Sequence, residues 1–139
     1  MKAVMSIKPR YVEMIREGKK KYEFRKKRLQ ENVTQIIMYS TKPQGKIVGW
    51  IRIDKQLSGS PSKLWSVTKD EAGITEDEFF EYYSESKKAY AYRICEVTIF
   101  PMQLEPFENF TIPQSIRYFK PWEEDILSWL EQSQEAITS

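Results

Sequence analysis

Three successive strand-like segments in the first half of the chain constrain the fold more than any other feature. The first, KKYEFR at 20–25, alternates in character, so Tyr22 and Phe24 fall on one face of a strand. The second, VTQIIMYS at 33–40, is rich in β-branched residues, and the turn sequence KPQG joins it to KIVGWIRI at 46–53. The pattern predicts a β-hairpin from the last two segments, preceded by a further strand.

Helical signals interrupt the strands at two places. After the short strand MKAVMSI, Pro9 is suited to the first turn of a helix, and Gly18 is suited to its end. Two further helices are predicted at about 61–71 and 76–85, because a Ser or Thr in the N-cap position precedes each of them.

The order of the elements predicts the fold class. The longest strand, AYAYRICEVTIF, follows the helices and is expected to end at Pro101, and MQLEPF after it is expected to form a last strand. Strands with helices inserted at two places predict an α+β fold, a small mixed β-barrel decorated by short helices. An open α+β sheet is the alternative.

The last residues predict a C-terminal helix. Its apolar stripe consists of Trp122, Ile126, Trp129 and Leu130. We therefore expect a barrel domain over residues 1–120 and a helix over residues 121–139 that packs on the barrel as part of the same domain. The alternative is that this helix binds a partner protein.

The distribution of charge indicates an anionic ligand. The net charge of the 139 residues is only +2, but residues 1–28 hold 11 Lys or Arg and 3 Asp or Glu, a net charge of +8. The remaining residues hold 11 and 17, a net charge of −6. Such asymmetry is typical of a basic face for phosphates or nucleic acid. The alternative is a solvated face that acidic residues balance in the fold.

The residue types that are missing exclude several classes of chemistry. The chain has no histidine, which rules out a Ser-His-Asp triad. A single cysteine, Cys95, allows no internal disulfide and no Cys/His zinc site, so we expect no metal and no cofactor. No apolar run approaches the roughly 20 residues of a membrane span. The first residues also lack the apolar stretch of a signal peptide, so we expect a cytoplasmic protein without membrane contact.

Three segments, in order, resemble a known family. SIKPRYVEMIREGKKKYEFRK resembles the opening signature of ASCH-domain proteins, a branch of the PUA-like superfamily. LWSVTKDEAGITEDEFFEYYSESKKAYAYRI resembles the middle of one bacterial and phage-borne subgroup, and IPQSIRYF resembles the closing motif of that subgroup. The resemblance covers about residues 1–120. It implies a PUA-like barrel whose cleft binds RNA or a nucleotide.

The resemblance and the chemistry of the residues together predict a set of ligand-binding side chains. The set is Lys8, Lys20, Glu23, Arg25, Tyr39, Gln114, Ser115 and Tyr118. Lys8 precedes a helix whose free N–H groups favour anions, and Arg25 can hold a phosphate through two parallel hydrogen bonds. Glu23 can accept a hydrogen bond from a base amino group. The alternative for Glu23 is a weak surface ion pair with a neighbouring Lys or Arg.

The position of these residues in the chain predicts one shared site. We expect every member of the set except Tyr39 to converge on one basic concavity, although the two groups of residues lie about 90 positions apart. The amide of Gln114 and the hydroxyl of Ser115 can read base edges, and the ring of Tyr118 can stack on a base. Tyr39 ends a strand and is expected to offer its hydroxyl at the mouth of the barrel.

Three functions remain open on the sequence. The first is RNA or nucleotide binding, which includes a regulator that binds a nucleotide and a partner protein. The second is metal-free cleavage of RNA, for which Lys20 and Glu23 are candidates as the base. The third is the amidohydrolase type of this family, which acts on acetylated cytidine with a Lys, a Thr and a Glu. Lys20 matches that Lys, but Glu23 stands at the Thr position, and a carboxylate cannot replace a hydroxyl nucleophile without a change of mechanism.

Overall fold

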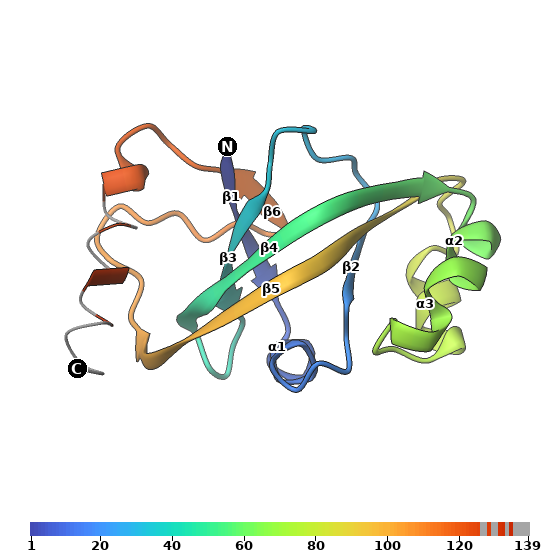
Figure 1. Cartoon of the computed structure of the whole chain (residues 1–139), viewed down its shortest axis with the longest axis horizontal. Helices are drawn as coiled ribbons and strands as arrows, with labels where there is room; N and C mark the ends of the chain where they lie inside the picture. Colours follow the sequence, from blue (N-terminus) through green and yellow to red (C-terminus); the bar gives the residue numbers. More distant parts are fainter. Residues whose placement is uncertain (126–127, 129–130, 133, 135–139) are drawn as a thin grey trace.

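The computed structural model describes residues 1–125, 128, 131–132 and 134, and within them one mixed sheet curls into a half-barrel (Figure 1). Its strands, in spatial order, are β2 (Tyr22–Arg25), β5 (Ala89–Leu104), β4 (Lys46–Gly59), β3 (Gln35–Ser40), β1 (Lys2–Ile7) and β6 (Ile116–Tyr118). β1 and β3 pair in parallel, and the other neighbours pair antiparallel. The α+β fold class predicted from the order of the elements is confirmed.

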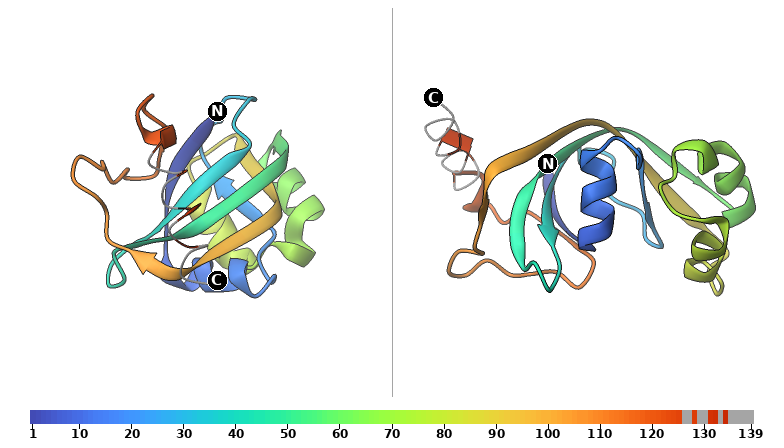
Figure 2. Two further views of the ribbon diagram at one scale, coloured as in Figure 1. Left: turned by 60° about the vertical axis from the view of Figure 1, so that its left-hand side comes forward. Right: turned by 90° about the horizontal axis from the view of Figure 1, so that it is seen from below.

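The helices lie where the capping residues predict them. They are α1 (Pro9–Arg16), α2 (Pro61–Thr68), the 3-10 turn η1 (Lys69–Glu71) and α3 (Glu76–Tyr82). The side chains of Ser60 and Thr75 each accept a hydrogen bond from a backbone N–H group in the first turn of α2 and α3. The right-hand view of Figure 2 shows α1 beneath the arch of β4 and β5, with α2 and α3 at one end of these long strands.

Apolar side chains cover both faces of the sheet. The main cluster lies on the face toward α1, where Val12 and Ile15 of the helix pack with residues such as Met5 and Ile36. A second cluster joins the outer end of the sheet to α2 and α3, with Phe79 at its centre. A third cluster lies on the opposite face of β1, β3 and β4, beneath the segment that follows β5.

The basic segment that contains β2 is packed on two sides. Phe24 is buried against α2 and α3, as the alternation in the sequence predicts. Glu23 points the other way and is also buried, with 4% of its surface exposed. Glu23 does pair with its neighbours Lys20 and Arg25, as the alternative states, but its carboxylate is buried and does not lie at the surface. Lys26, Lys27 and Arg28, which follow the strand, are exposed.

The end of β5 differs from the prediction. The strand does not end at Pro101 but continues to Leu104, and MQLEPF therefore contributes to β5 instead of forming a strand of its own. The ladder between β4 and β5 shifts its register between the pairs Gly49–Ile99 and Ile47–Leu104, so Pro101 lies in an irregular stretch. A proline is tolerated there because no regular ladder position requires its missing N–H group.

Several described residues of the C-terminal segment contact the sheet and its connections. The ring of Trp122 lies 6.2 Å from that of Phe107, and the amide of Gln134 exchanges two hydrogen bonds with the backbone of Met102 (3.0 and 3.2 Å). The other members of the predicted stripe, at positions 126, 129 and 130, lie outside the described residues. The boundary at residue 120 stays a prediction. Within the described residues no helix is long and apolar enough to cross a membrane.

Candidate functional site

A cavity of about 570 Å³ opens where the end of β1, the start of α1, β2 and α3 meet the segment that precedes β6. We call it the Glu23 cavity, after the carboxylate that lines it. Its lining comes from residues as far apart in the chain as Ser6 and Gln114. The curled sheet brings these distant segments together, because β1 lies between β3 and β6 near one edge of the half-barrel.

Glu23 is the buried acidic group of the cavity. One of its oxygens, Oε2, lies 3.0 Å from a terminal nitrogen of Arg25, and the other, Oε1, lies 3.8 Å from Nζ of Lys20. The side chains of Glu23 and Lys20 are 5% and 3% exposed, so both charges are almost completely removed from water. Each carboxylate oxygen thus faces one nitrogen donor and keeps a further lone pair that can accept a hydrogen bond from a ligand.

Lys20 is held at the floor of the cavity. Its Nζ donates to the backbone carbonyl of Ala72 (3.1 Å) and lies over the rings of Phe24 and Tyr11, 4.8 and 5.2 Å from their centres. Burial lowers the pKa of Lys20 below its ordinary value, and the nearby charge of Glu23 opposes this effect. The amine therefore gives up its proton more readily than a solvated lysine, which is the property that a base or nucleophile requires.

Gly73 allows this placement of Lys20. Its φ is +69°, in the left-handed region that favours glycine, and a Cβ atom at this position would lie 2.4 Å from Cβ of Lys20. The backbone between η1 and α3 can approach Lys20 only because residue 73 has no side chain. The close approach explains why the carbonyl of Ala72 can reach the amine.

Arg25 connects the two edges of the half-barrel. One terminal nitrogen donates to Oγ of Ser115 (2.9 Å), and the other donates to the backbone carbonyl of Ser6 (3.1 Å) and to Glu23 (3.0 Å). Nε of Arg25 is buried, and its N–H group donates no hydrogen bond to any described residue. The guanidinium thus fixes the position of Glu23 relative to β1 and the segment before β6.

The rim of the cavity combines cations, a carboxylate and a tyrosine. Lys8 is exposed immediately before α1, and Arg10 donates to the hydroxyl of Tyr11 (2.7 Å) and to Glu78 (2.9 Å). The hydroxyl of Tyr11 in turn donates to Glu78 (3.0 Å), which lowers the pKa of that carboxyl. Burial and the hydrogen bond to Glu78 raise the pKa of Tyr11, so its hydroxyl stays protonated.

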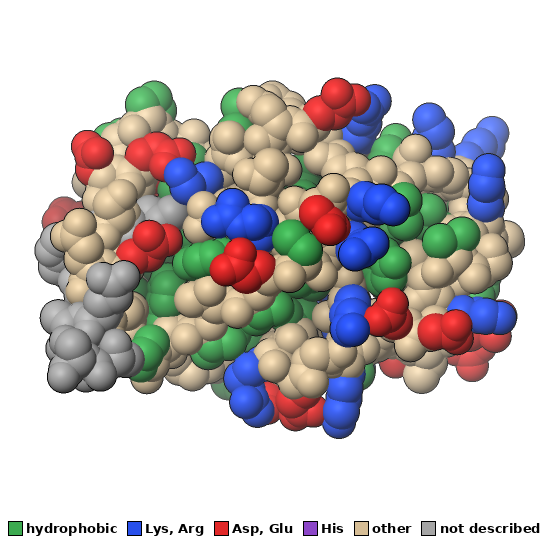
Figure 3. Space-filling view, viewed as in Figure 1, with side chains coloured by type: hydrophobic (Ala, Val, Ile, Leu, Met, Phe, Trp, Pro, Cys, Tyr) green, Lys and Arg blue, Asp and Glu red, His purple; other side chains and the backbone are tan. Residues whose placement is uncertain are grey.

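The charge of the cavity is mixed. Among the described residues that line it, four are cationic (Lys8, Arg10, Lys20 and Arg25) and three are acidic (Glu23, Glu78 and Glu81). Acidic side chains are likewise interspersed with Lys and Arg on the face of the molecule in Figure 3, where no uniformly basic patch is visible. Such a site suits a ligand that carries both an anion and hydrogen-bond donors.

The structure brings most of the predicted set together. Lys8, Lys20, Glu23, Arg25 and Gln114 line the Glu23 cavity, and Ser115 adjoins it through Arg25. Two members lie elsewhere, because their strands direct them away. Tyr39 is buried in the third apolar cluster, and the hydroxyl of Tyr118 accepts a hydrogen bond from the backbone of Gln30 (3.2 Å).

Several side chains of the cavity were not foreseen from the sequence, among them Arg10, Tyr11, Glu78 and Tyr82. Tyr11 is one turn of helix beyond Lys8, so its spacing from Lys8 could have predicted that it lies on the same side of α1. Glu78 and Tyr82 are i and i+4 on α3, which places them on one face of the helix, but nothing in the sequence relates that face to β2. No group of three or more His, Cys, Asp or Glu that could hold a metal ion is present among the described residues.

Comparison with known proteins identifies the family of the chain. The model of the ASCH domain family matches residues 5–135. The chain belongs to the ASCH-domain family. A curated ASCH relative from the bacterium Zymomonas mobilis, named an ASCH domain-containing ribonuclease, is 29% identical over 124 residues, which are 85% of this chain and 84% of the relative.

Solved ASCH structures are similar over most of their length. The crystal structure of ASCH from Zymomonas mobilis has a TM-score of 0.84 and 26% identity, and the match covers 93% of this chain and 94% of that one. The N-terminal domain of McrB from Staphylothermus marinus has a TM-score of 0.56 at 13% identity, over 91% of this chain and 92% of that domain. This second similarity shows a shared fold alone.

Proposed function

We propose that this ASCH-domain protein binds single-stranded RNA with one nucleotide in the Glu23 cavity and cleaves the strand there. One observation carries the proposal: a buried carboxylate lines the cavity next to a rim with exposed cations. A nucleotide has the matching two parts, a phosphate and a base edge with N–H donors. The name of the Zymomonas mobilis relative, which is a ribonuclease, supports the choice of RNA.

In this proposal the rim of the cavity binds the phosphate, and the floor binds the base. Lys8, next to the N-terminus of α1, and Arg10 are placed to contact phosphate oxygens, which bind in a salt-dependent way. Glu23 accepts hydrogen bonds from the base edge. Tyr82 of α3 is 38% exposed at the cavity and offers a ring on which a base can stack.

Cleavage in this proposal uses the 2′-hydroxyl of the bound ribose. The neutral amine of Lys20 takes the proton of that hydroxyl, and the oxygen attacks the adjacent phosphorus. The bond from phosphorus to the 5′-oxygen breaks, and the 5′-oxygen takes up a proton from water, so the products are a 2′,3′-cyclic phosphate and a 5′-hydroxyl end. Arg10 and Lys8 stabilise the negative charge that develops on the phosphate oxygens.

The test compares defined single-stranded RNA oligonucleotides with DNA of the same sequence, with and without a chelator. We expect binding that weakens with salt, cleavage of RNA only, and cyclic phosphate ends. Lys20→Met should abolish cleavage, whereas Lys69→Ala, a change of an exposed lysine that does not line the cavity, should leave it unchanged. If the protein does not bind RNA at low salt, the proposal is refuted. If it binds RNA without cleaving it, the cleavage step is refuted and RNA binding alone stands.

A further inference from the structure

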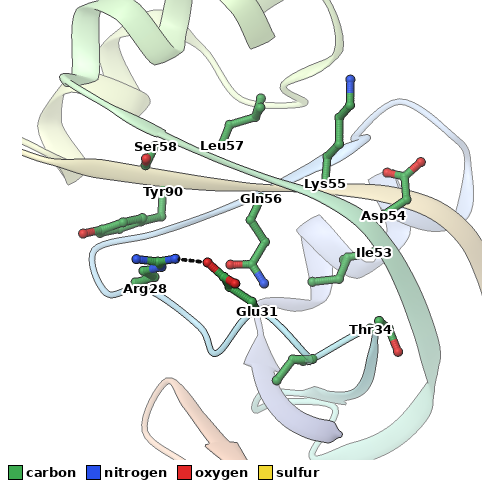
Figure 4. A pocket seen from close by; sticks show the side chains of 11 residues that line it. Arg28, Glu31, Thr34, Ile53, Asp54, Lys55, Gln56, Leu57, Ser58 and Tyr90 are labelled. Carbon is green, nitrogen blue, oxygen red and sulfur yellow. Dashed lines mark hydrogen bonds and ion pairs between the residues drawn. The ribbon is translucent and has the colours of Figure 1, made fainter.

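A second cavity, of about 390 Å³, lies between the loop at 26–34 and the outer half of β4. Figure 4 shows that Arg28, Glu31 and Gln56 point toward one another across it and that the ring of Tyr90 lies beside Arg28, whereas the side chains of Lys55 and Leu57 point away. None of these residues has a part in the Glu23 cavity. We call it the Tyr90 cavity.

The pairing of the strands explains why this space is open. β3 accompanies β4 only as far as the pair Gln35–Arg52, and the N–H group of Ile53 then bonds to the carbonyl of Thr34 (2.9 Å). Beyond that point β4 has β5 on one side only. The loop runs alongside the other edge without pairing, and Gln56 reaches across to the carbonyl of Gln30 (3.2 Å).

The side chains of the Tyr90 cavity can recognise a nucleotide. The ring of Tyr90 is partly buried against the core, which fixes it as a surface for stacking, and the amide of Gln56 can pair with a base edge. Arg28 is bound to Glu31 in an ion pair whose side chains are 61% and 81% exposed. An ion pair as exposed as this is weak, so a phosphate can replace Glu31 on the guanidinium.

The two cavities adjoin along β2. Tyr90 is the cross-strand partner of Arg25, which lines the Glu23 cavity, and Arg28 follows Arg25 by three residues. Three residues of extended chain span at most about 10 Å. The exposed Lys26 and Lys27 occupy the interval between the cavities. One flexible strand of nucleic acid can therefore reach both cavities over a continuous cationic segment.

We propose that the Tyr90 cavity is a second subsite, which binds a further nucleotide of the RNA strand held in the Glu23 cavity. The inference rests on the proposed function and adds to it a minimum length of the substrate: a strand of more than two nucleotides that crosses β2. Glu31 competes with the RNA phosphate for Arg28. Removal of its charge should therefore strengthen binding of a strand that reaches the Tyr90 cavity, while binding of a shorter strand should not change.

The test measures the affinity of a uridine dinucleotide and a uridine hexanucleotide of RNA under conditions in which cleavage is not detected. We expect the wild-type protein to bind the hexanucleotide several times more tightly. Arg28→Ala should remove much of that gain and lower the salt slope by about 0.7 for one lost phosphate contact. Glu31→Gln should increase the affinity for the hexanucleotide. Neither change should alter the affinity for the dinucleotide, and Lys69→Ala should change neither affinity.

The outcomes separate this inference from the function on which it rests. If the wild-type protein binds neither oligonucleotide, both proposals fail. If it binds both oligonucleotides equally, or if Arg28→Ala and Glu31→Gln leave the hexanucleotide affinity unchanged, the second subsite is refuted while the Glu23 cavity stands. If Arg28→Ala lowers the affinity for both oligonucleotides by the same factor, Arg28 acts only through its charge, and the second subsite is likewise refuted.

Discussion

The guanidinium of Arg25 donates a hydrogen bond of 2.9 Å to the hydroxyl of Ser115, and this bond spans the opening of the half-barrel. Arg25 belongs to β2, at one end of the strand order, and Ser115 immediately precedes β6, at the other end. Among the described residues, β2 and β6 do not pair with each other through backbone hydrogen bonds, so side chains connect these two edge strands.

Replacement of Arg25 should affect stability much more than replacement of Ser115. Arg25→Ala leaves the buried Glu23 with Lys20 as its remaining cation, and the loss of a buried charge partner typically costs about 3 kcal/mol. Ser115→Ala removes one neutral hydroxyl from an exposed position, which costs about 1 kcal/mol or less. Denaturant unfolding of both variants measures the two values. Equal losses would contradict the central role of the Glu23–Arg25 contact.

Gly73→Ala should destabilise the protein more than Gly18→Ala. Both glycines have a positive φ, +69° and +78°, so alanine is strained at either position by about 1 kcal/mol. A Cβ atom at position 18 meets nothing within 4 Å, whereas at position 73 it meets the backbone and side chain of Lys20. The difference between the two variants in the free energy of unfolding therefore measures the cost of the contact between a Cβ atom at position 73 and Lys20. A difference near zero would show that Lys20 can move aside freely.

The stability contributed by Lys20 should depend on pH in a defined direction. Burial lowers its pKa below 10.5, so the folded chain holds this proton less tightly than the unfolded chain does. The buried charge therefore costs stability below the folded-state pKa, and the cost disappears as the pH rises from that value toward 10.5. Relative to Lys20→Met, the wild-type protein should gain stability over this interval. Unfolding measured at several pH values tests this, and a difference between the two proteins that falls with pH would contradict it.

Tyr82 should contribute to RNA binding through its ring. Tyr82→Ala is expected to weaken binding of single-stranded RNA by about 1–3 kcal/mol, the usual value for one stacked base. Tyr82→Phe keeps the ring and should retain most of the affinity. Equilibrium titration of the three proteins with one oligonucleotide gives the comparison. Equal weakening by Phe and Ala would assign the effect to the hydroxyl and not to stacking.

Glu23 should determine which base the cavity prefers. Glu23→Gln replaces an oxygen acceptor by an N–H donor, so the order of affinity among uridine, cytidine, adenosine and guanosine oligonucleotides should change. Glu17→Gln, at an exposed carboxylate outside the Glu23 cavity, is the matched control and should preserve the order. The change also removes the partner of two buried cations, so circular dichroism must first show a folded variant. An unchanged order in a folded Glu23→Gln protein would exclude base reading by this residue.

The sequence predicts the elements well because their signals are local. The N-caps Ser60 and Thr75 and the alternation of Tyr22 and Phe24 act within one turn of helix or one strand. The burial of Glu23 could not be predicted in the same way. Alternation defines two faces of a strand, but segments far along the chain decide whether the second face is covered.

The positions of Tyr39 and Tyr118 illustrate the same limit. Every residue of β3 is buried, and alternate residues enter two different apolar clusters, with Met38 on one face and Tyr39 on the other. A strand that is apolar on both faces gives no indication of which face borders a cavity. Gln114 and Ser115 were recognisable because they are polar residues in a segment without a clean period, although nothing local shows that Arg25 lies beside them.

The distance of 90 residues between Arg25 and Ser115 also orders events during synthesis. At about 5–20 residues per second, Ser115 is added roughly 5–20 s after Arg25. Until then β1 lacks its neighbour β6, Arg25 lacks one of its acceptors, and Gln114 is missing from the Glu23 cavity. We therefore expect the nascent chain to acquire its binding cavity only after residues 114–118 have been added and have emerged from the ribosome. The part of the chain before Gln114 therefore leaves the ribosome without a complete Glu23 cavity.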